Sequence, residues 1–520
     1  MKPIAPIRQP ISAALLLAIP TSDPAKLVRQ LARTPPLQRR KPTYQVVDAV
    51  YHDTPEQRLH QQHITWRTQR VDGDEPVQWR QFLHVEKREN ATLRRYEEWT
   101  SPIRSSTPEM GVLQSSTGSR IDPDGTAFRT LAPCFSTRTE RTSWSIHQRD
   151  GSLIDVVLNV GHLSAGGQTV PVFELELVLL AGHPAALFEV AQKISRTLAV
   201  LPTPTSSAER GLALARGTLD APLKALPVAL KKDVSLAFAA GCMLNEMLGQ
   251  FIANLYALCT SEDPEVVHQA RVGWRRFKSA VRLFRPALPV ESLPSWEPLE
   301  PLLGFLGTLR DLDVALTETL PRLNEAYTAG DIGREETWAA MTQAMQQAAH
   351  LQRKSVRYAL QAPEVGTVLL ETLRWIEGLL VTTEAEEPLG KKLVALRPWA
   401  RHRVGRLHKQ LTAAAKDIGH LESQHRIRIL AKRMRYSTES LQTFLPKMRA
   451  ERWHQQAACL QATLGFTRDT IRASALAAEV GTDPRLVEFL RGAAAGQQTR
   501  DATQKNRKNL KSYTCRIEPY

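Results

Sequence analysis

The sequence is poor in cysteine. Its 520 residues include five cysteines and no Cys-x-x-Cys pair; the five are Cys134, Cys242, Cys259, Cys459 and Cys515. Scattered single cysteines exclude a zinc site of paired cysteines and argue against a disulfide framework. This cysteine usage is typical of a reducing compartment, so we predict that the protein is cytoplasmic.

Long apolar runs are also absent. No segment has the roughly 20 consecutive apolar residues that a membrane-spanning helix requires. The apolar stretch at residues 11–19 is short, is interrupted or bounded by Pro10 and Pro20, and lacks a clear cleavage site. We therefore interpret it as a buried strand rather than a signal peptide, and we predict no membrane association.

Acidic residues are too few to balance the basic ones. Lys and Arg total 68 against 53 Asp and Glu, which gives a net charge of +15. An excess of this size indicates an anionic partner such as nucleic acid, a membrane surface or a phosphate polymer. Aromatic residues make up only 6% of the chain, and few stand where they could stack on bases. Nucleic acid is therefore the less favoured partner.

The N-terminal part of the chain has the alternation of β-strands. The clearest case is a hairpin whose strands, residues 153–160 and 170–179, flank a glycine turn. Within the second strand, Glu174 and Glu176 alternate with apolar residues and so face the opposite side of the sheet. This pattern predicts an antiparallel β domain.

Helical periodicity begins near residue 227 and continues almost to the end of the chain. Asp263, followed by proline and glutamate, has the pattern of a helix N-terminus. We predict a β domain over residues 1–215, a linker at 216–227, a helical domain over 228–495, and a disordered tail at 496–520, where Gln, Asn and Lys are frequent. The fold class is therefore α+β.

An internal repeat lies within the helical part. His268, Arg271, Arg275 and Lys278 recur 157 residues later as His425, Arg428, Lys432 and Arg435. Each set is followed by a Leu-Gly-x-x-Arg-Asp segment, at residues 306–311 and 464–469. Agreement at both places indicates a duplicated helical unit. We interpret the Arg-Asp pairs Arg310-Asp311 and Arg468-Asp469 as contacts between helices that orient the basic ones.

The repeated cations fall on one side of each helix. At 100° per residue, positions 0, 3, 7 and 10 occupy a wedge of about 80°. Cations at these spacings repel one another, so a matched pair of such stripes suggests that an anion neutralises them. A single stripe of this kind is more often a solvated surface, and a lone histidine is more often structural. The matched second copy favours a binding site.

The repeat resembles the CHAD domain. The similar segments are VHQARVGWRRFKSAVRLF and HRIRILAKRMRYSTESL, with LGTLRDLDV and LGFTRD downstream. The resemblance implies a pseudo-twofold bundle of long helices with a basic pore that binds inorganic polyphosphate. It implies that the polymer contacts His268, Arg271, Arg275, Arg282, His425, Arg428, Lys432, Arg435 and Tyr436. The repeat adds Lys278 to these predicted contacts. Arg353, Arg357, Arg406 and Lys409 are candidates for extending the pore.

The N-terminal part is similar to the CYTH domain, a triphosphate tunnel. The similar segments are VYHDTPEQRLHQQHITWRTQR, LRRYEEW and PVFELEL. The resemblance implies an antiparallel barrel whose carboxylates hold a divalent metal while cations hold a triphosphate. Residues that could form a residual site of this kind are Arg67, Glu97, Arg141, Glu174 and Glu176.

The chain departs from the CYTH pattern at the opening strand. That family has Glu-x-Glu-x-Lys there, whereas residues 11–19 contain neither an acid nor a lysine. His84 and Asn159 stand where the family has a basic residue and an aspartate. We therefore assign no catalytic residue and no metal ligand, and we expect the barrel to bind phosphate weakly or to act as a scaffold.

The sequence thus predicts a cytoplasmic protein that binds inorganic polyphosphate and associates with polyphosphate granules. We expect it to need no cofactor, and no segment identifies a protein partner. The alternative is a metal-dependent inorganic triphosphatase that acts through the N-terminal barrel, in which case Mg²⁺ is the cofactor.

Overall fold

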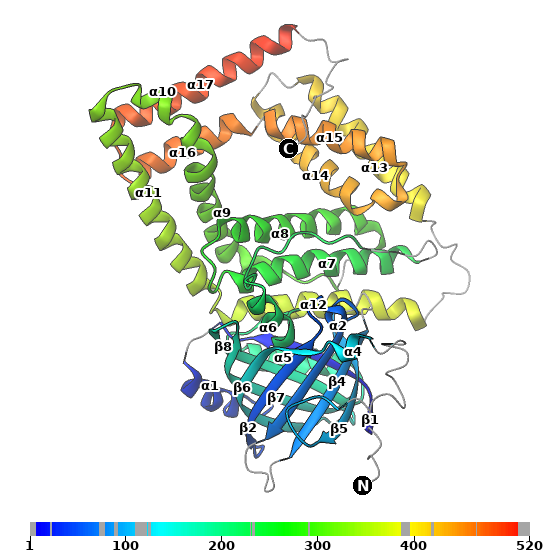
Figure 1. Ribbon diagram of the computed structural model, residues 1–520. Coiled ribbons are helices and arrows are strands. Elements are labelled where there is room, and N and C mark those ends of the chain that lie inside the picture. The colour runs from blue at the N-terminus through cyan, green and yellow to red at the C-terminus, as the bar shows by residue number, and fades with distance from the viewer. Residues whose placement is uncertain are drawn as a thin grey trace.

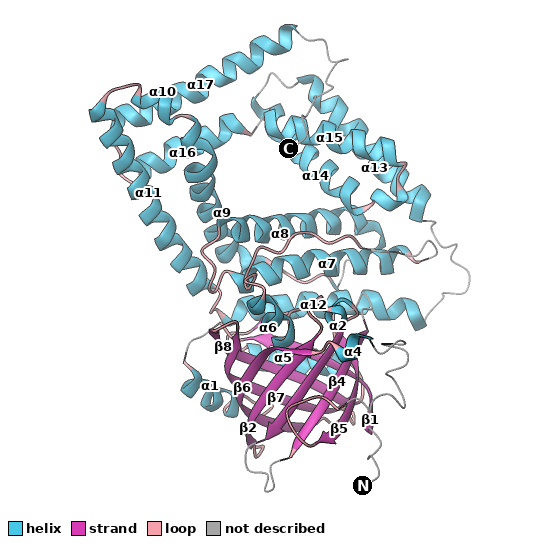
Figure 2. Cartoon of the chain, viewed as in Figure 1, coloured by secondary structure: helices cyan, strands magenta, loops and turns pink. Residues whose placement is uncertain are grey.

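The computed structural model in Figure 1 describes most of the chain, namely residues 7–20, 23–71, 78–87, 92–109, 122, 126–228, 230, 234–289, 292–385, 396–417, 421–463 and 465–507. All described strands precede residue 203, and the described elements beyond residue 215 are helices (Figure 2). The predicted α+β class, with an antiparallel barrel followed by a helical domain, is confirmed.

Eight antiparallel strands form a closed barrel. They pair in the order β5-β4-β3-β2-β6-β7-β8-β1, and β1 pairs back with β5. Closure leaves no free sheet edge. A short strand, β9 (Leu201–Pro202), pairs with the end of β1. The barrel strands are β1 Ile7–Ala18, β2 Thr43–Asp53, β3 Ile64–Val71, β4 Trp79–Lys87, β5 Arg94–Ile103, β6 Ala132–His147, β7 Leu153–Ala165 and β8 Gln168–Ala181.

Alternation along β1 and β8 sorts side chains between the two faces of the barrel wall. Leu15 and Leu17 of β1 belong to the same buried core as Leu175 and Leu177 of β8 and the helix α5 (Ala185–Ser195). This core lies on the outer face, so the residues between these leucines face the interior. The strand predicted at residues 11–19 and the predicted β7–β8 hairpin are confirmed.

A helix occupies one end of the barrel. Helix α6 (Ser207–Ala215) begins with a capping box in which Ser206 and Glu209 bond to each other's backbone N–H groups. Its Leu212 and Leu214 pack with Phe135 of β6 in a separate cluster on the inner side of the wall. Shorter helices are α1 Pro24–Ala32, α2 Arg58–Gln61 and α4 Thr126–Arg129.

The helical domain follows the barrel in the chain and lies above it in Figure 1. Antiparallel neighbours such as α7–α8, α14–α15 and α16–α17 pack along their lengths. The helices are α7 Leu236–Ala257, α8 Pro264–Phe284, α9 Glu300–Val314, α10 Asn324–Thr328, α11 Ile332–Ala359, α12 Pro363–Ala385, α13 Leu396–Ala414, α14 Leu421–Ser440, α15 Lys447–Thr463, α16 Phe466–Glu479 and α17 Pro484–Arg507.

Two expectations about these helices need correction. Residues 496–507, which we assigned to a disordered tail, continue α17, while 508–520 lie outside the described residues. Among the described helices, α7 alone is long and apolar enough to cross a membrane by length and composition, contrary to our reading of the sequence. In the structure 61% of that apolar window is buried. A helix buried on most sides is apolar all round for the same reason as a spanning helix.

Helix α12 joins the two domains, since it packs against both α5 of the barrel domain and α7. Glu377 of α12 is 6% exposed and accepts hydrogen bonds from the backbone and the hydroxyl of Thr92, at 3.1 and 2.5 Å. The hydroxyls of Ser195 and Thr367 lie 2.8 Å apart across the same interface. These buried polar contacts fix α12 against the barrel wall.

The interface predicts opposite effects of one substitution at two glycines of α12. A Cβ at Gly366 would overlap the carbonyl oxygen of Val200, whereas a Cβ at Gly378 faces open space. Gly366→Ala should lower the free energy of unfolding by about 1–3 kcal/mol through overpacking. Gly378→Ala should raise it by up to about 1 kcal/mol through helix propensity. Urea unfolding measures both, and equal effects at the two positions would contradict the close interface.

Candidate functional site

Helix α8 presents a stripe of cations next to its buried face. The Asp263 side chain caps the helix by accepting a hydrogen bond from the backbone N–H of Glu265 at 2.8 Å. The apolar face, which includes the fully buried Phe277, packs into the core of the domain. Arg271 and Arg275 lie one turn apart and partly exposed on the adjoining stripe.

Helix α14 brings the second copy of the stripe to the first, because it packs against α8. The positive charge of Arg275 acts on both Arg428 and Lys432 of α14. Arg468, in the first turn of α16, acts on Arg271, Arg428 and Lys432 alike. We refer to these five residues, which come from both copies of the repeat, as the central cation cluster.

Burial and repulsion by neighbouring cations lower the pKa values of three members of the cluster, Arg271, Arg428 and Lys432. Burial, followed by the charges of Arg275 and Arg428, lowers the pKa of Lys432 from 10.5 to about 8. Burial and then Arg275 lower the pKa of Arg271. Among the described residues, Arg271, Arg275, Lys432 and Arg468 form no salt bridge. Two nearby acids, Asp311 and Asp469, act on Arg271 and Arg428 through their charges, so the positive charge of the cluster is partly but not fully compensated.

The first Leu-Gly-x-x-Arg-Asp segment lies on α9 beside the cluster. A side chain at Gly307 would place its Cβ 3.2 Å from Nη1 of Arg271, so the glycine leaves room for that guanidinium. Asp311 accepts a hydrogen bond from Nε of Arg472 on α16 at 3.0 Å. This ion pair joins the two copies of the repeat and has the structural role that we expected of Asp311.

Arg468 is a member of the site that we did not expect from the sequence. We interpreted both Arg-Asp pairs as structural, but Arg468 is exposed and belongs to the cluster. Its counterpart Arg310 is instead paired with Glu318 at 2.7 Å. The sequence carried a signal, because Leu476 stands 158 residues after Glu318 and provides no carboxylate for Arg468.

Lys278 and Arg435, the last cations of the two stripes, have partners outside the cluster. Nζ of Lys278 lies 4.9 Å from the ring centroid of Trp296. Arg435 donates to Oε1 of Gln461 on α15 at 3.3 Å and lies 3.7 Å from the carboxylate of Glu439. Lys278 and Arg435 occupy equivalent positions of the repeat, and both have structural partners. They therefore lie outside the central cation cluster.

The remaining predicted contacts lie around the cluster. Burial, followed by the charge of Arg310, lowers the pKa of His268, so this ring is neutral near pH 7. His425 is exposed at the beginning of α14, and Arg282 is exposed at the end of α8. Tyr436 is only 5% exposed and is part of the packed side of α14.

Two proposed extensions of the pore have another role. Arg357 donates three hydrogen bonds of 3.1 Å to carbonyl oxygens at and just after the end of α7. Arg353 is 5% exposed and forms a salt bridge with Glu262 at 3.1 Å. Both arginines therefore attach α11 to the end of α7. Arg406 and Lys409 are exposed on α13.

The inner wall of the barrel carries charges of both signs. Arg141 donates from Nε to Asn159 at 3.0 Å. The hydroxyl of Ser207, in the first turn of α6, donates to Glu174 at 2.9 Å. Arg94 makes two parallel bonds with Glu86, at 2.9 and 3.0 Å. Four of the five predicted barrel residues lie on this wall: Arg67, Arg141, Glu174 and Glu176.

Glu98 is the acid on β5 that faces the interior, and Glu97 does not. Glu98 accepts a hydrogen bond from His84 and lies 3.7 Å from Arg67. Burial acts to raise the pKa of Glu98, but the hydrogen bond from His84 and the charge of Arg67 outweigh burial and lower that pKa. Glu97 points to the outer side, where it pairs with Lys87 at 3.1 Å. Adjacent acids on a strand face opposite sides, so a choice one residue away selects the wrong face.

The inner positions of β1 are apolar where a metal site would need carboxylates. Leu16 lies directly opposite Glu176, and Ala18 directly opposite Glu174; each apolar residue is 2% exposed. Burial, followed by the charge of Glu176, raises the pKa of Glu174. Among the described residues, no group of three or more His, Cys, Asp or Glu side chains is placed to hold a metal ion. The barrel residues therefore do not fit a divalent metal site.

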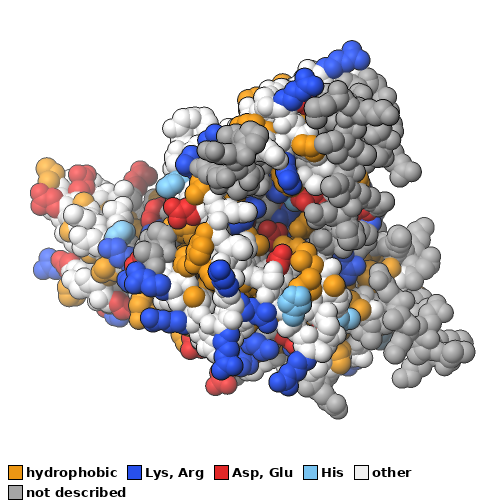
Figure 3. Space-filling view, turned by 90° about the horizontal axis from the view of Figure 1, so that it is seen from below, with side chains coloured by type: hydrophobic (Ala, Val, Ile, Leu, Met, Phe, Trp, Pro, Cys, Tyr) orange, Lys and Arg blue, Asp and Glu red, His pale blue; other side chains and the backbone are white. Residues whose placement is uncertain are grey.

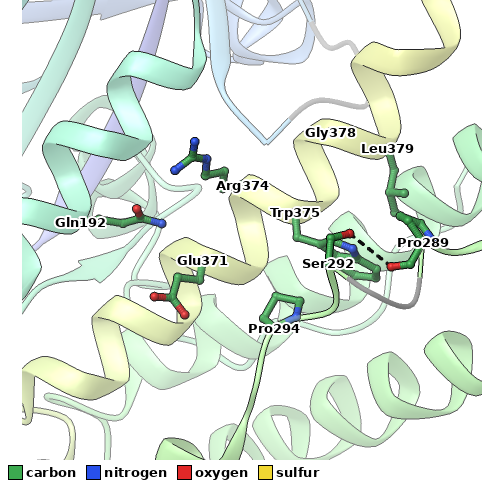
Figure 4. A pocket seen from close by; sticks show the side chains of 9 residues that line it. All are labelled: Gln192, Pro289, Ser292, Pro294, Glu371, Arg374, Trp375, Gly378 and Leu379. Atoms are coloured by element: carbon green, nitrogen blue, oxygen red, sulfur yellow. Dashed lines mark hydrogen bonds between the residues drawn. The ribbon is translucent and has the colours of Figure 1, made fainter.

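The face of the molecule seen in Figure 3 shows no single field of positive charge. Figure 3, seen from the barrel side, shows basic and acidic side chains interspersed with apolar ones. A hollow of about 600 Å³ lies between the domains where α5 meets α12 (Figure 4). Its lining combines Arg374 and Glu371 with the ring of Trp375, and Arg374 pairs with Glu189 at 3.4 Å. Balanced charge makes this hollow a poor site for a polyanion.

Comparison with solved structures finds separate relatives of the two halves. The CHAD domain of Ricinus communis is 28% identical to this chain and has a TM-score of 0.46. The match covers 54% of this chain and 92% of the Ricinus communis chain. An adenylyl cyclase candidate from Hippeastrum, described as having a dominant triphosphatase activity, is 16% identical, covers 40% of this chain and 96% of its own, and has a TM-score of 0.29. An adenylate cyclase candidate from Bacillus halodurans is 12% identical, covers the same shares and has a TM-score of 0.25.

Family models assign the two halves directly. The CYTH domain model matches residues 26–212, which include all barrel strands except β1. The CHAD domain model matches residues 242–478, from within α7 to within α16, and so includes every member of the central cation cluster. The chain therefore contains a CYTH domain followed by a CHAD domain.

Proposed function

We propose that the CHAD domain binds inorganic polyphosphate through the central cation cluster. The observation that carries this proposal is the convergence of five cations from both copies of the repeat, which outnumber the two acids that act on them, Asp311 and Asp469. The lowered pKa values of Arg271, Arg428 and Lys432 mean that neighbouring positive charges make it less favourable for these side chains to be charged. A bound polyanion removes that cost and accepts charge-assisted hydrogen bonds from arginine.

The shape of the cation distribution favours a linear polymer over a single small anion. The five cations come from three helices, α8, α14 and α16, rather than from one loop or helix end. A polymer with a charge on every unit can contact several of them at once, which increases affinity through effective concentration. Single-stranded nucleic acid would in addition require exposed aromatic side chains for its bases. Trp274, the aromatic residue of α8 closest to the stripe, is instead 8% exposed and packed against Trp296.

The barrel supports a scaffold role better than hydrolysis. Its arginines already have carboxylate or amide partners, and the inner face of β1 gives no metal ligand. A triphosphate would have to displace these internal partners without a metal ion to neutralise its charge. We infer a degenerate CYTH domain that supports the CHAD domain through α12. Polyphosphate binding also implies a cytoplasmic location at polyphosphate granules.

Of the repeated cations on α8, Arg275 belongs to the central cation cluster, whereas Lys278 lies outside it beside Trp296. Arg275→Ala should weaken binding of long-chain polyphosphate about tenfold or more, because a hydrogen bond to a charged group contributes about 1.5–3 kcal/mol. Lys278→Ala removes the same charge from the next turn of α8 and should change affinity less than about threefold. Calorimetric titration of both variants tests this, with circular dichroism to verify folding. Equal losses would place Lys278 in the site and contradict the division.

Binding should weaken as pH rises above 8. The pKa of Lys432 is lowered to about 8 in the free protein, and a bound anion favours the charged form, so binding is coupled to proton uptake. Affinity should be constant below pH 7 and should fall by up to about tenfold per pH unit above 8. Lys432→Arg keeps its charge at these pH values and should flatten the profile. An unchanged pH dependence in Lys432→Arg would exclude this lysine as the titrating group.

Inorganic triphosphate should be hydrolysed slowly or not at all, even with Mg²⁺ or Mn²⁺, because the inner face of β1 is apolar. Phosphate release from the full-length protein is the measurement. Rapid metal-dependent turnover that Glu174→Gln or Glu176→Gln abolishes would support the triphosphatase alternative instead.

A further inference from the structure

A second pair of cations lies at the end of α8. Arg282 is seven residues after Arg275 on the same stripe, which is roughly 10 Å along the helix axis. It is exposed, and its charge acts on Arg433 of the neighbouring helix α14. Arg433 follows Lys432 directly and lies about 100° farther around α14. Its counterpart 157 residues earlier is Arg276, which forms a salt bridge with Glu246 at 3.0 Å.

The pair lacks internal compensation among the described residues. Nε of Arg433 is buried and has no hydrogen-bond partner there, and neither arginine takes part in a salt bridge there. Burial, followed by the charge of Arg282, lowers the pKa of Arg433. A buried guanidinium donor that faces a like charge is unfavourable unless an anion occupies the position.

A structural explanation accounts for only one of the two residues. A cation in the last turn of a helix is stabilised by the helix dipole, so Arg282 would be favourable there without any ligand. Arg433 lies in the middle of α14 and gains nothing from a helix end. The Lys278 position between the two clusters is engaged with Trp296, which separates this pair from the central cation cluster.

We propose that Arg282 and Arg433 form a second anion-binding position for the same polymer. This inference rests on polyphosphate binding at the central cation cluster. A chain that is long enough reaches both positions and gains from their linkage, whereas inorganic triphosphate contacts one position at a time. The site therefore discriminates between phosphate chains by length, and Arg433 is a specificity-determining residue.

The test compares inorganic triphosphate with long-chain polyphosphate on the full-length protein. Arg433→Ala should weaken binding of the long chain by about tenfold. It should leave triphosphate affinity within about twofold. The salt dependence of long-chain binding should lose roughly one unit of slope, because one phosphate contact is removed. Arg485→Ala, which removes an exposed cation from the first turn of α17, is the matched control and should change neither ligand.

Each outcome separates this inference from the proposed function. If the wild-type protein does not bind long-chain polyphosphate, the function itself is wrong. If it binds and Arg433→Ala matches Arg485→Ala, the second position is refuted while the function stands. Equal weakening of both ligands would also refute it, since Arg433 would then only support the central cluster. Arg433→Gln retains part of the buried side chain and replaces the alanine variant if that variant fails to fold.

Discussion

Repulsion between like charges is the constraint around which the helical domain is built. Five cations from α8, α14 and α16 lie close together, and burial and the charges of neighbouring cations lower the pKa values of three of them, Arg271, Arg428 and Lys432. Apolar burial must supply the free energy that holds them there, and the buried faces of α7 and α8 are large and continuous. The Asp311–Arg472 ion pair adds a specific link between α9 and α16. The scaffold is therefore organised to keep an unfavourable charge arrangement in place.

The barrel treats charge in the opposite way. Arg94 is matched by Glu86, Arg141 by Asn159, and Arg67 by Glu98. Internal partners of this kind stabilise the barrel but leave little attraction for an external anion. The two domains, joined rigidly at α12, thus differ in where their positive charge is available. This difference argues for anion binding in the helical domain and mechanical support by the barrel.

Much of this arrangement could be predicted from the sequence, because it follows from periodicity. The repeat of 157 residues and the helical wedge identified Arg271, Arg275, Arg428 and Lys432. The partners that hold Lys278 and Arg435 could not be predicted in the same way. Trp296 is 18 residues away from Lys278 and lies outside α8, and Gln461 lies on another helix than Arg435.

The errors in the barrel have a related origin. Glu97 and Glu98 are adjacent, and sequence alone did not specify which of them faces inward; the cross-strand partner His84 does. The arginines of α11 were assigned to a pore from their charge, although Arg357 binds carbonyl oxygens at the end of α7 and Arg353 pairs with Glu262 and Asp313. Local periodicity determines which residues share a face, but contacts distant in sequence determine what that face meets.

The duplicated unit is not symmetric in its charge, and this asymmetry has a consequence for binding. In the first copy Glu318 forms a salt bridge with Arg310, whereas the corresponding position of the second copy is Leu476, which provides no carboxylate for Arg468. The arginine at this repeat position is therefore less compensated in the second copy, on α16, than in the first copy, on α9. An unbranched phosphate chain is the same in both directions, so the asymmetry cannot select an orientation. If the chain binds as proposed, we expect the asymmetry instead to draw more of it toward α16, where Arg468 lies.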